Sequence, residues 1–145
     1  MKNELIKALE GILANTYILY LKTQNYHWHV KGPNFKAFHA LFEEQYIDLA
    51  DAVDTIAEQI LMMGHRAPAN FKAFESLREI KDGDSSLDAN SMVKSLADDN
   101  DTLLKALHKA LTLCEGVHEE GAENVLSDRV NAHEKARWML RASCE

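Results

Sequence analysis

Residues 26–43 read YHWHVKGPNFKAFHALFE, and this stretch marks the boundary between two long helical segments. Apolar residues recur at helical spacing before and after it, while KGPN at 31–34 interrupts the pattern. Gly32 suits a helix C-terminal cap, Pro33 cannot continue a helix, and Asn34 can cap the helix that follows. The stretch therefore predicts two helices joined by a tight link, which makes them antiparallel neighbours.

Helical periodicity extends over most of the remaining chain, with no competing strand-like alternation. A turn-rich segment near DGDSSLD ends at Asp88, which is expected to cap the helix after it. The predicted long helices cover 3–30, 35–63, 89–115 and 119–142, and FKAFESLREI in the connection 65–88 predicts a short helix of about two turns.

Four long helices with one long connection predict an all-α fold, a four-helix bundle. The connection 65–88 must travel the length of the bundle, so the third and fourth long helices form a second antiparallel pair. A bundle with one long crossover has the ferritin-like topology. Because 145 residues suit a single core, we expect residues 1–145 to form one domain.

Composition narrows the class of protein further. The formal charge of −7 opposes bulk attraction to nucleic acid, because phosphate backbones are also negative. The N-terminus does not resemble a signal peptide, and no apolar run is long enough for a transmembrane helix. Cys114 and Cys144 form no CxxC motif and are expected to be reduced thiols of a cytoplasmic protein.

Two pairs of potential metal ligands lie on the predicted helix 35–63. His39 and Glu43 are four residues apart, and so are Asp54 and Glu58, so each pair shares a helix face. The eleven residues from Glu43 to Asp54 make about three turns, so both pairs lie on nearly the same side, a side that otherwise carries apolar groups. Along the axis, however, they are roughly 16 Å apart, too far to share one ion with bonds of about 2 Å.

The spacing leaves two readings: two separate half-sites, or a site completed by a second subunit. A two-fold axis near the middle of the helix would bring the 39/43 end of one copy to the 54/58 end of the other. His27, across the short link, can join His39 and Glu43. Two imidazoles and three carboxylates suit Fe(II), Mn(II) or Zn(II), and carboxylates favour iron oxidation. Against this, most pairs at this spacing are simply solvated faces.

The segment NYHWHVKGPNFKAFHALFEEQYIDLADAVDTIAEQI resembles the Dps family, the mini-ferritins. The family pattern is a histidine before tryptophan, a glycine-containing break, His-x-x-x-Asp/Glu and then Asp-x-x-x-Glu. The resemblance covers nearly the whole chain in helix order. It places the family's ferroxidase ligands, shared between two subunits, on the following positions: His27, His39, Glu43, Asp54 and Glu58. Position 43 is Glu where many members have Asp, which changes the reach of the carboxylate.

The resemblance implies that the protein is an enzyme, a ferroxidase, and that it also stores iron. Family members form hollow shells of twelve subunits, oxidise Fe(II), preferentially with hydrogen peroxide, and store ferric mineral, which protects against oxidative damage. Trp28 matches a tryptophan that lies near the family's iron site. Acids line the family's iron-entry pores, and Glu119, Glu120 and Glu123 are the candidates here. Their alternative role is to stabilise the N-terminus of the last helix.

Many Dps proteins bind DNA through a lysine-rich N-terminal tail, and here only Lys2 and Lys7 are basic near a helix that begins by Asn3. We therefore expect weak or no DNA binding. Two alternatives remain: a DNA-compacting protein of the same fold, and a four-helix metal or stress-interaction module without mineral.

Four other candidate residues are interpreted as bystanders or as structural. His29 should point away from His27, because residues two apart face different sides of a helix. A core or interface hydrogen bond is expected for His133, and the Glu115/His118 pair is interpreted as incidental.

Overall fold

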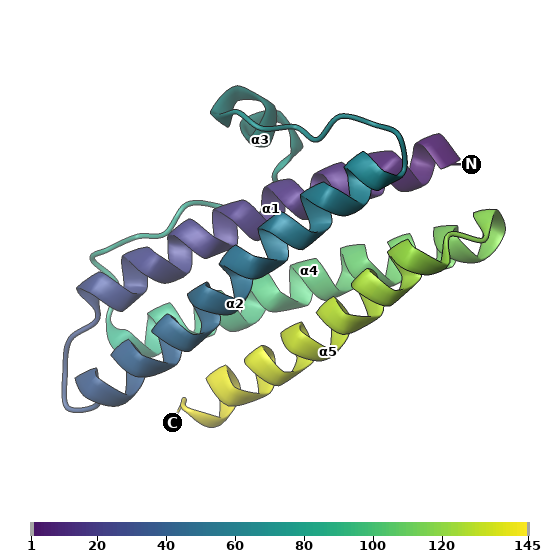
Figure 1. The fold of residues 1–145 in the computed structure, drawn as a ribbon. Coiled ribbons are helices and arrows are strands. Elements are labelled where there is room, and N and C mark those ends of the chain that lie inside the picture. The colour runs from purple at the N-terminus through teal and green to yellow at the C-terminus, as the bar shows by residue number, and fades with distance from the viewer. Residues whose placement is uncertain (1, 145) are drawn as a thin grey trace.

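Five helices make up the fold in the computed structural model, which describes residues 2–144 (Figure 1). No strand occurs among these residues, so the predicted all-α fold is confirmed. The helices are α1 (Lys2–His29), α2 (Phe35–Met62), α3 (Phe71–Leu77), α4 (Ala89–Val117) and α5 (Glu120–Ala142). The four long helices form the bundle, and the short α3 lies outside it, beside α1 (Figure 1).

The bundle consists of two antiparallel helix pairs, α1 with α2 and α4 with α5 (Figure 1). The pairs join where α1 packs against α4 and α2 packs against α5. The crossover from α2 to α4 passes through α3 and then runs along α1 to the far end of the bundle (Figure 1). This is the predicted topology, with its short extra helix in the long connection.

The crossover is held on α1 by hydrogen bonds to its backbone. The buried Asn15 side-chain oxygen accepts from the backbone N–H groups of Glu79 and Ile80, at 2.8 and 3.0 Å. Further along, the Tyr26 hydroxyl accepts from the backbone N–H of Asp84 at 3.3 Å. These contacts satisfy backbone groups that a loop lying on a bundle would otherwise leave unpaired.

The helix ends follow the predicted signals in most places. Asp88 caps α4, because its carboxylate accepts from the backbone N–H of Ser91 at 2.8 Å. Gly32 takes a left-handed φ of 119°, but it does so in the link, three residues after α1 ends. Asn34 occupies the N-cap position of α2, yet its side chain makes no capping hydrogen bond, so that part of the prediction is wrong.

The turn between α4 and α5 differs from the sequence expectation. The predicted break began after residue 115, but α4 continues through Gly116 to Val117. His118 then ends the helix in the left-handed region with a φ of 56°. The α4–α5 turn is therefore only two residues long, which fits the close antiparallel packing of this pair.

Leucine, isoleucine and phenylalanine side chains from all four long helices fill the core. Fully buried examples are Leu9, Leu13, Phe42, Ile56, Leu96, Leu103, Leu126 and Leu140. Burial of each such side chain stabilises the fold by roughly 1.5–3 kcal/mol relative to exposure. None of the helices in residues 2–144 is both long and apolar enough to cross a bilayer.

Ion pairs add specific links between the helices. Lys22 of α1 and Asp99 of α4 form a largely buried ion pair at 2.7 Å.

Both cysteine thiols are free. Cys114 is buried near the end of α4, whereas Cys144 follows α5 at the opposite end of that helix pair.

Candidate metal centre

The link between α1 and α2 brings two histidine rings into direct contact. His27 lies in the last turn of α1, and His39 lies near the start of α2. The rings stack with centroids 3.8 Å apart and planes 13° apart. Each ring nitrogen Nδ1 lies 2.7 Å from the backbone oxygen of the other histidine, so the two residues hold each other reciprocally.

This reciprocal arrangement fixes the tautomer of both imidazoles. A backbone carbonyl oxygen can only accept a hydrogen bond, so Nδ1 of each ring must carry the proton and donate it. In neutral imidazole the remaining nitrogen, Nε2, then has a free lone pair. Metal-binding histidines are commonly oriented in this way, by a hydrogen bond from the nitrogen that does not bind the metal.

A carboxylate completes a three-residue cluster on the same side of the link. Glu43 Oε1 lies 3.7 Å from His27 Nε2, and the donor atoms of His27, His39 and Glu43 all lie within 4.8 Å of one another. His27 is buried, His39 is partly buried, and Glu43 is exposed. The cluster therefore has a protected imidazole side and an open carboxylate side.

Aromatic side chains support both rings. Phe35 stacks on His39 with centroids 5.0 Å apart, and Tyr46 meets His27 edge-on at 5.2 Å. Packing on the two ring faces, together with the Nδ1 hydrogen bonds, leaves each imidazole little freedom to rotate. A donor set that is rigid before a ligand arrives loses less entropy on binding.

Asp54 and Glu58 lie farther along α2 and do not join this cluster. Both are exposed, and so is Glu43, while Phe42 and Ile56 on the same helix are buried. The sequence-based expectation that these carboxylates share the buried apolar face is therefore wrong within one chain. They lie instead on a stripe of α2 that faces away from the core.

Two neighbours of His27 point outward. Trp28 is 60% exposed, and His29 is exposed with its Nδ1 held by the backbone oxygen of Asn25 at 2.8 Å. The expectation that His29 points away from His27 is confirmed, and its role as a bystander stays a prediction. The placement of Trp28 near an iron site stays a prediction.

The acidic pore candidates gather at the start of α5. Glu119 precedes the helix and lies 3.7 Å from Lys2, while Glu120 and Glu123 are exposed in the first turn. Acids in this position are favoured by the helix dipole. Their role in a pore stays a prediction. His118 is exposed at the end of α4, as is Glu115, and the two belong to no metal-like cluster in the described residues.

A polar network links the exposed Asp48 of α2 to buried side chains of α4 and α5. Arg129 donates to both carboxylate oxygens of Asp48, at 3.0 and 2.9 Å. Arg129 also donates to His133 Nε2 at 3.1 Å, and His133 Nδ1–H donates to Asn100 Oδ1 at 2.7 Å. The prediction of an internal hydrogen bond for His133 is confirmed, but its partners were missed. Arg129 lies four residues before His133 on α5, but Asn100 and Asp48 come from α4 and α2, and no local spacing in the sequence connects them with His133.

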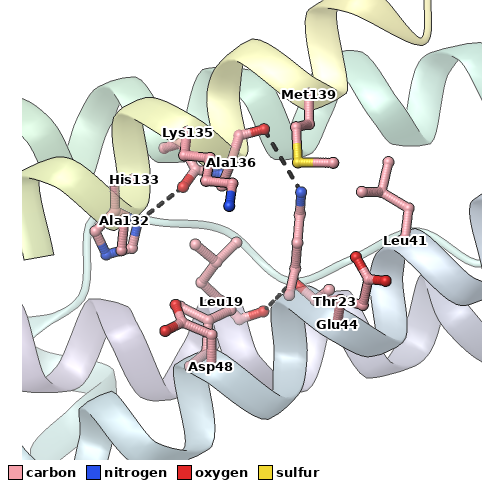
Figure 2. A pocket seen from close by; sticks show the side chains of 13 residues that line it. Leu19, Thr23, Leu41, Glu44, Asp48, Ala132, His133, Lys135, Ala136 and Met139 are labelled. Carbon is pink, nitrogen blue, oxygen red and sulfur yellow. Dashed lines mark hydrogen bonds between the residues drawn. The ribbon is translucent and has the colours of Figure 1, made fainter.

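Burial holds His133 in its neutral form. Removal from water, together with the positive charge of Arg129, lowers its pKa to about 3, although Asp48 acts in the opposite direction. A cavity of about 280 Å³ lies beside this network, between α2 and α5, with Leu19, Leu41 and Met139 among its apolar walls (Figure 2). None of the five predicted metal ligands, all within the described residues, lines this cavity.

A four-helix bundle with one long crossover has the ferritin-like topology. A family model described as a ferritin-like domain matches residues 6–145. The Dps protein of Vibrio cholerae O1, described as a member of a broad superfamily of ferritin-like diiron-carboxylate proteins, is a close structural match. It has a TM-score of 0.92 and 35% identity, with 97% of this chain and 88% of that chain covered.

Curated relatives agree with this assignment. DNA protection during starvation protein 2 of Bacillus anthracis is 32% identical over 142 residues, which cover 98% of this chain and 97% of that protein. General stress protein 20U of Bacillus subtilis (strain 168) is 32% identical over 142 residues and covers 98% of both chains. The chain therefore belongs to the Dps family of ferritin-like proteins, as the motif between residues 25 and 60 predicted.

Proposed function

We propose that this protein is an iron-oxidising, iron-storing mini-ferritin whose ferroxidase sites are shared between two subunits. The observation that supports this most strongly is the His27–His39 pair, whose reciprocal hydrogen bonds leave both Nε2 atoms free beside Glu43. Five ligands are proposed in all: His27, His39 and Glu43 from one subunit, and Asp54 and Glu58 from its partner.

The exposed stripe of α2 supports a two-fold contact. Glu43, Ile47, Asp51, Asp54 and Glu58 recur at three- or four-residue spacing, and all are exposed. Ile47 is 51% exposed and lies close to the midpoint between the two half-sites, where a partner helix would cover it. An antiparallel crossing there brings Glu43 of each subunit to Asp54 of the other, which produces two equivalent sites per dimer.

The donor set suits iron as the substrate. Neutral imidazoles bind Fe(II), and carboxylates, which are hard ligands, stabilise Fe(III) more than Fe(II). Such a site lowers the reduction potential of the bound iron and favours its oxidation, with hydrogen peroxide as the proposed oxidant. The product is stored as ferric mineral inside a homo-oligomeric shell, proposed to contain twelve subunits. This activity removes the two reactants of Fenton chemistry together.

Peroxide-driven iron oxidation tests the proposal directly. The protein is loaded anaerobically with Fe(II), peroxide is added, and ferric absorbance is followed in the native chain and in His39→Ala and Asp54→Ala. We expect both variants to oxidise iron much more slowly, whereas His29→Ala, which changes an exposed histidine outside the cluster, should behave like the native chain. Oxidation at the native rate in both ligand variants would refute the assignment.

The size of the assembly distinguishes a shell from a simpler metal-binding module. Size-exclusion chromatography should give a species far larger than a dimer. A monomer or dimer at micromolar concentration would contradict storage of mineral in a hollow shell, even if the metal site were present.

Compaction of DNA is the second candidate, since one relative is called a DNA protection protein. The formal charge of −7 opposes it, because a protein of this charge is repelled by the phosphate backbone. We expect DNA binding to be weak or absent.

A further inference from the structure

A groove of about 660 Å³ runs between α1 and α4, which lie side by side and antiparallel (Figure 1). Along α1 its lining extends from Glu4 to Asn15, which is roughly 16 Å at about 1.5 Å per residue. The small or apolar side chains that line it come from both helices: Ala8, Gly11, Ile12, Ala106 and Leu113. None of the five proposed iron ligands, all within the described residues, lines this groove.

Gly11 keeps the groove open in the middle of α1. Glycine within a helix destabilises it relative to alanine, so a helical glycine needs a reason. No contact within the chain supplies one, because a Cβ atom on Gly11 would meet nothing within 4 Å outside its own stretch of helix. A missing side chain lets another molecule approach the helix backbone closely. This position therefore suits contact with a group from outside the chain.

Asn15 presents an unpaired hydrogen-bond donor at one end of the groove. The residue is only 1% exposed, and its Oδ1 accepts from the backbone N–H groups of Glu79 and Ile80. These two bonds fix the orientation of the amide, and Nδ2 donates to no other group within residues 2–144. A largely buried N–H group without a partner is costly, and an acceptor oxygen of a bound molecule would satisfy it.

Lysines line the middle of the groove. Lys7 comes from α1, and Lys105 and Lys109 lie four residues apart on α4. No carboxylate within residues 2–144 forms an ion pair with any of the three. The acids of the groove, Glu4 and Glu79, lie towards its two ends. In a chain with a formal charge of −7, this local positive charge favours an acidic partner.

We propose that the α1–α4 groove binds an acidic helical segment of a partner protein. An apolar floor between basic edges suits an amphipathic helix, which lies in a groove through residues on one of its faces. Small residues on that face pack over Gly11, carboxylates beside them reach the three lysines, and one oxygen accepts from Asn15 Nδ2. The length of roughly 16 Å corresponds to about eleven residues of helix. This inference is independent of iron oxidation.

Fluorescence anisotropy with the assembled protein tests the proposal. The probe is a labelled synthetic helix of about fourteen residues, with alanine on the face that enters the groove and glutamate on both sides of that face. A matched peptide carries lysine in place of each glutamate. We expect saturable binding of the acidic peptide, weakened several-fold by added salt, and no binding of the lysine peptide.

Variants of the lining residues locate the binding. Gly11→Gln fills the groove and removes no contact within the chain, so it should abolish binding while the free energy of unfolding does not fall. Lys105→Glu and Lys109→Glu should each weaken binding several-fold. Lys94→Glu makes the same charge change at an exposed lysine of α4 outside the groove and should leave binding unchanged.

Several results would overturn the proposal. The native chain could fail to bind the acidic peptide or bind the lysine peptide equally well, or Gly11→Gln could bind the acidic peptide as tightly as the native chain. An equal loss of binding in Lys94→Glu and Lys105→Glu would show attraction to the whole surface rather than to the groove. A change in the size of the assembly in Gly11→Gln, measured by size-exclusion chromatography, would show that another copy of this chain occupies the groove.

Discussion

His133 makes the stability of this protein depend on pH in a predictable direction. In the folded chain its Nδ1–H donates to Asn100 and its Nε2 accepts from Arg129. A second proton would have to bind at Nε2, where it would face the Arg129 N–H and break that hydrogen bond. Burial and this positive charge hold the pKa at about 3, against 6.5 for histidine in an unfolded chain. The unfolded state therefore binds more protons between these two values.

The size of the effect follows from the two pKa values. Each unit of difference corresponds to about 1.4 kcal/mol, so lowering the pH from above 6.5 to 5 should cost about 2 kcal/mol per subunit, and lowering it to 3 should cost about 4 kcal/mol. The contribution is fully present above the unfolded pKa and is lost progressively as the pH falls towards the folded pKa.

Denaturant unfolding at a fixed protein concentration, at several pH values between 7 and 4, measures this slope. In His133→Gln the titrating group is absent, so its free energy of unfolding should fall with decreasing pH less steeply than in the native chain. His108→Gln changes an exposed histidine of α4 and should keep the native slope. Equal slopes in the native chain and His133→Gln would refute the assignment of a buried neutral His133.

Four further predictions concern stability and binding. Lys22→Met leaves Asp99 buried without its partner and should cost about 3–5 kcal/mol in denaturant unfolding, while the double variant Lys22→Met/Asp99→Leu should recover most of this loss. Phe42→Ala removes a fully buried ring and should cost about 3–5 kcal/mol, measured as a lower thermal midpoint. Asn15→Ala should cost about 1–3 kcal/mol and speed amide hydrogen exchange at Ile80, and protected exchange there would contradict the anchoring of the crossover. Gel shifts at physiological salt should show no retained DNA duplex, and retention by the assembled protein would contradict the charge argument.

Local sequence signals were sufficient for most of the fold. The break at 31–34, the capping residue Asp88 and the short helix in the crossover were all predictable, because each depends on neighbouring residues alone. The end of α4 was less predictable. Glycine usually marks a helix end, but Gly116 remains helical and His118 takes the left-handed conformation, because the packing of α4 on α5 decides where the turn falls.

The candidate site was predictable to the extent that it is local. His39 and Glu43 share a helix face, and the short link places His27 beside them, so their proximity follows from helix geometry. The mutual Nδ1–carbonyl bonds and the ring stacking depend on how the two helices cross, which periodicity does not reveal. The network around His133 is likewise tertiary, since its members come from three different helices.

The environment of the carboxylates on α2 could not be predicted from the sequence of a single chain. Asp54 was expected among apolar neighbours of a buried face, but in one chain it is exposed. Helix periodicity predicts on which side of the helix a side chain lies. It does not predict whether another helix or another subunit covers that side, because this depends on the assembly. The separation of about 16 Å along the helix axis between the two half-sites therefore remains the main argument for a second subunit.

Mixed assemblies test the shared site most directly. His39→Ala and Asp54→Ala subunits, each expected to oxidise iron much more slowly alone, are unfolded together in equal amounts, reassembled and assayed for peroxide-driven iron oxidation. With random pairing half of the two-fold dimers are mixed, and each mixed dimer has one of its two sites intact, so the account predicts recovery of about a quarter of the native rate. If the mixture is no more active than either variant alone, the ligands do not come from two subunits and the central claim fails.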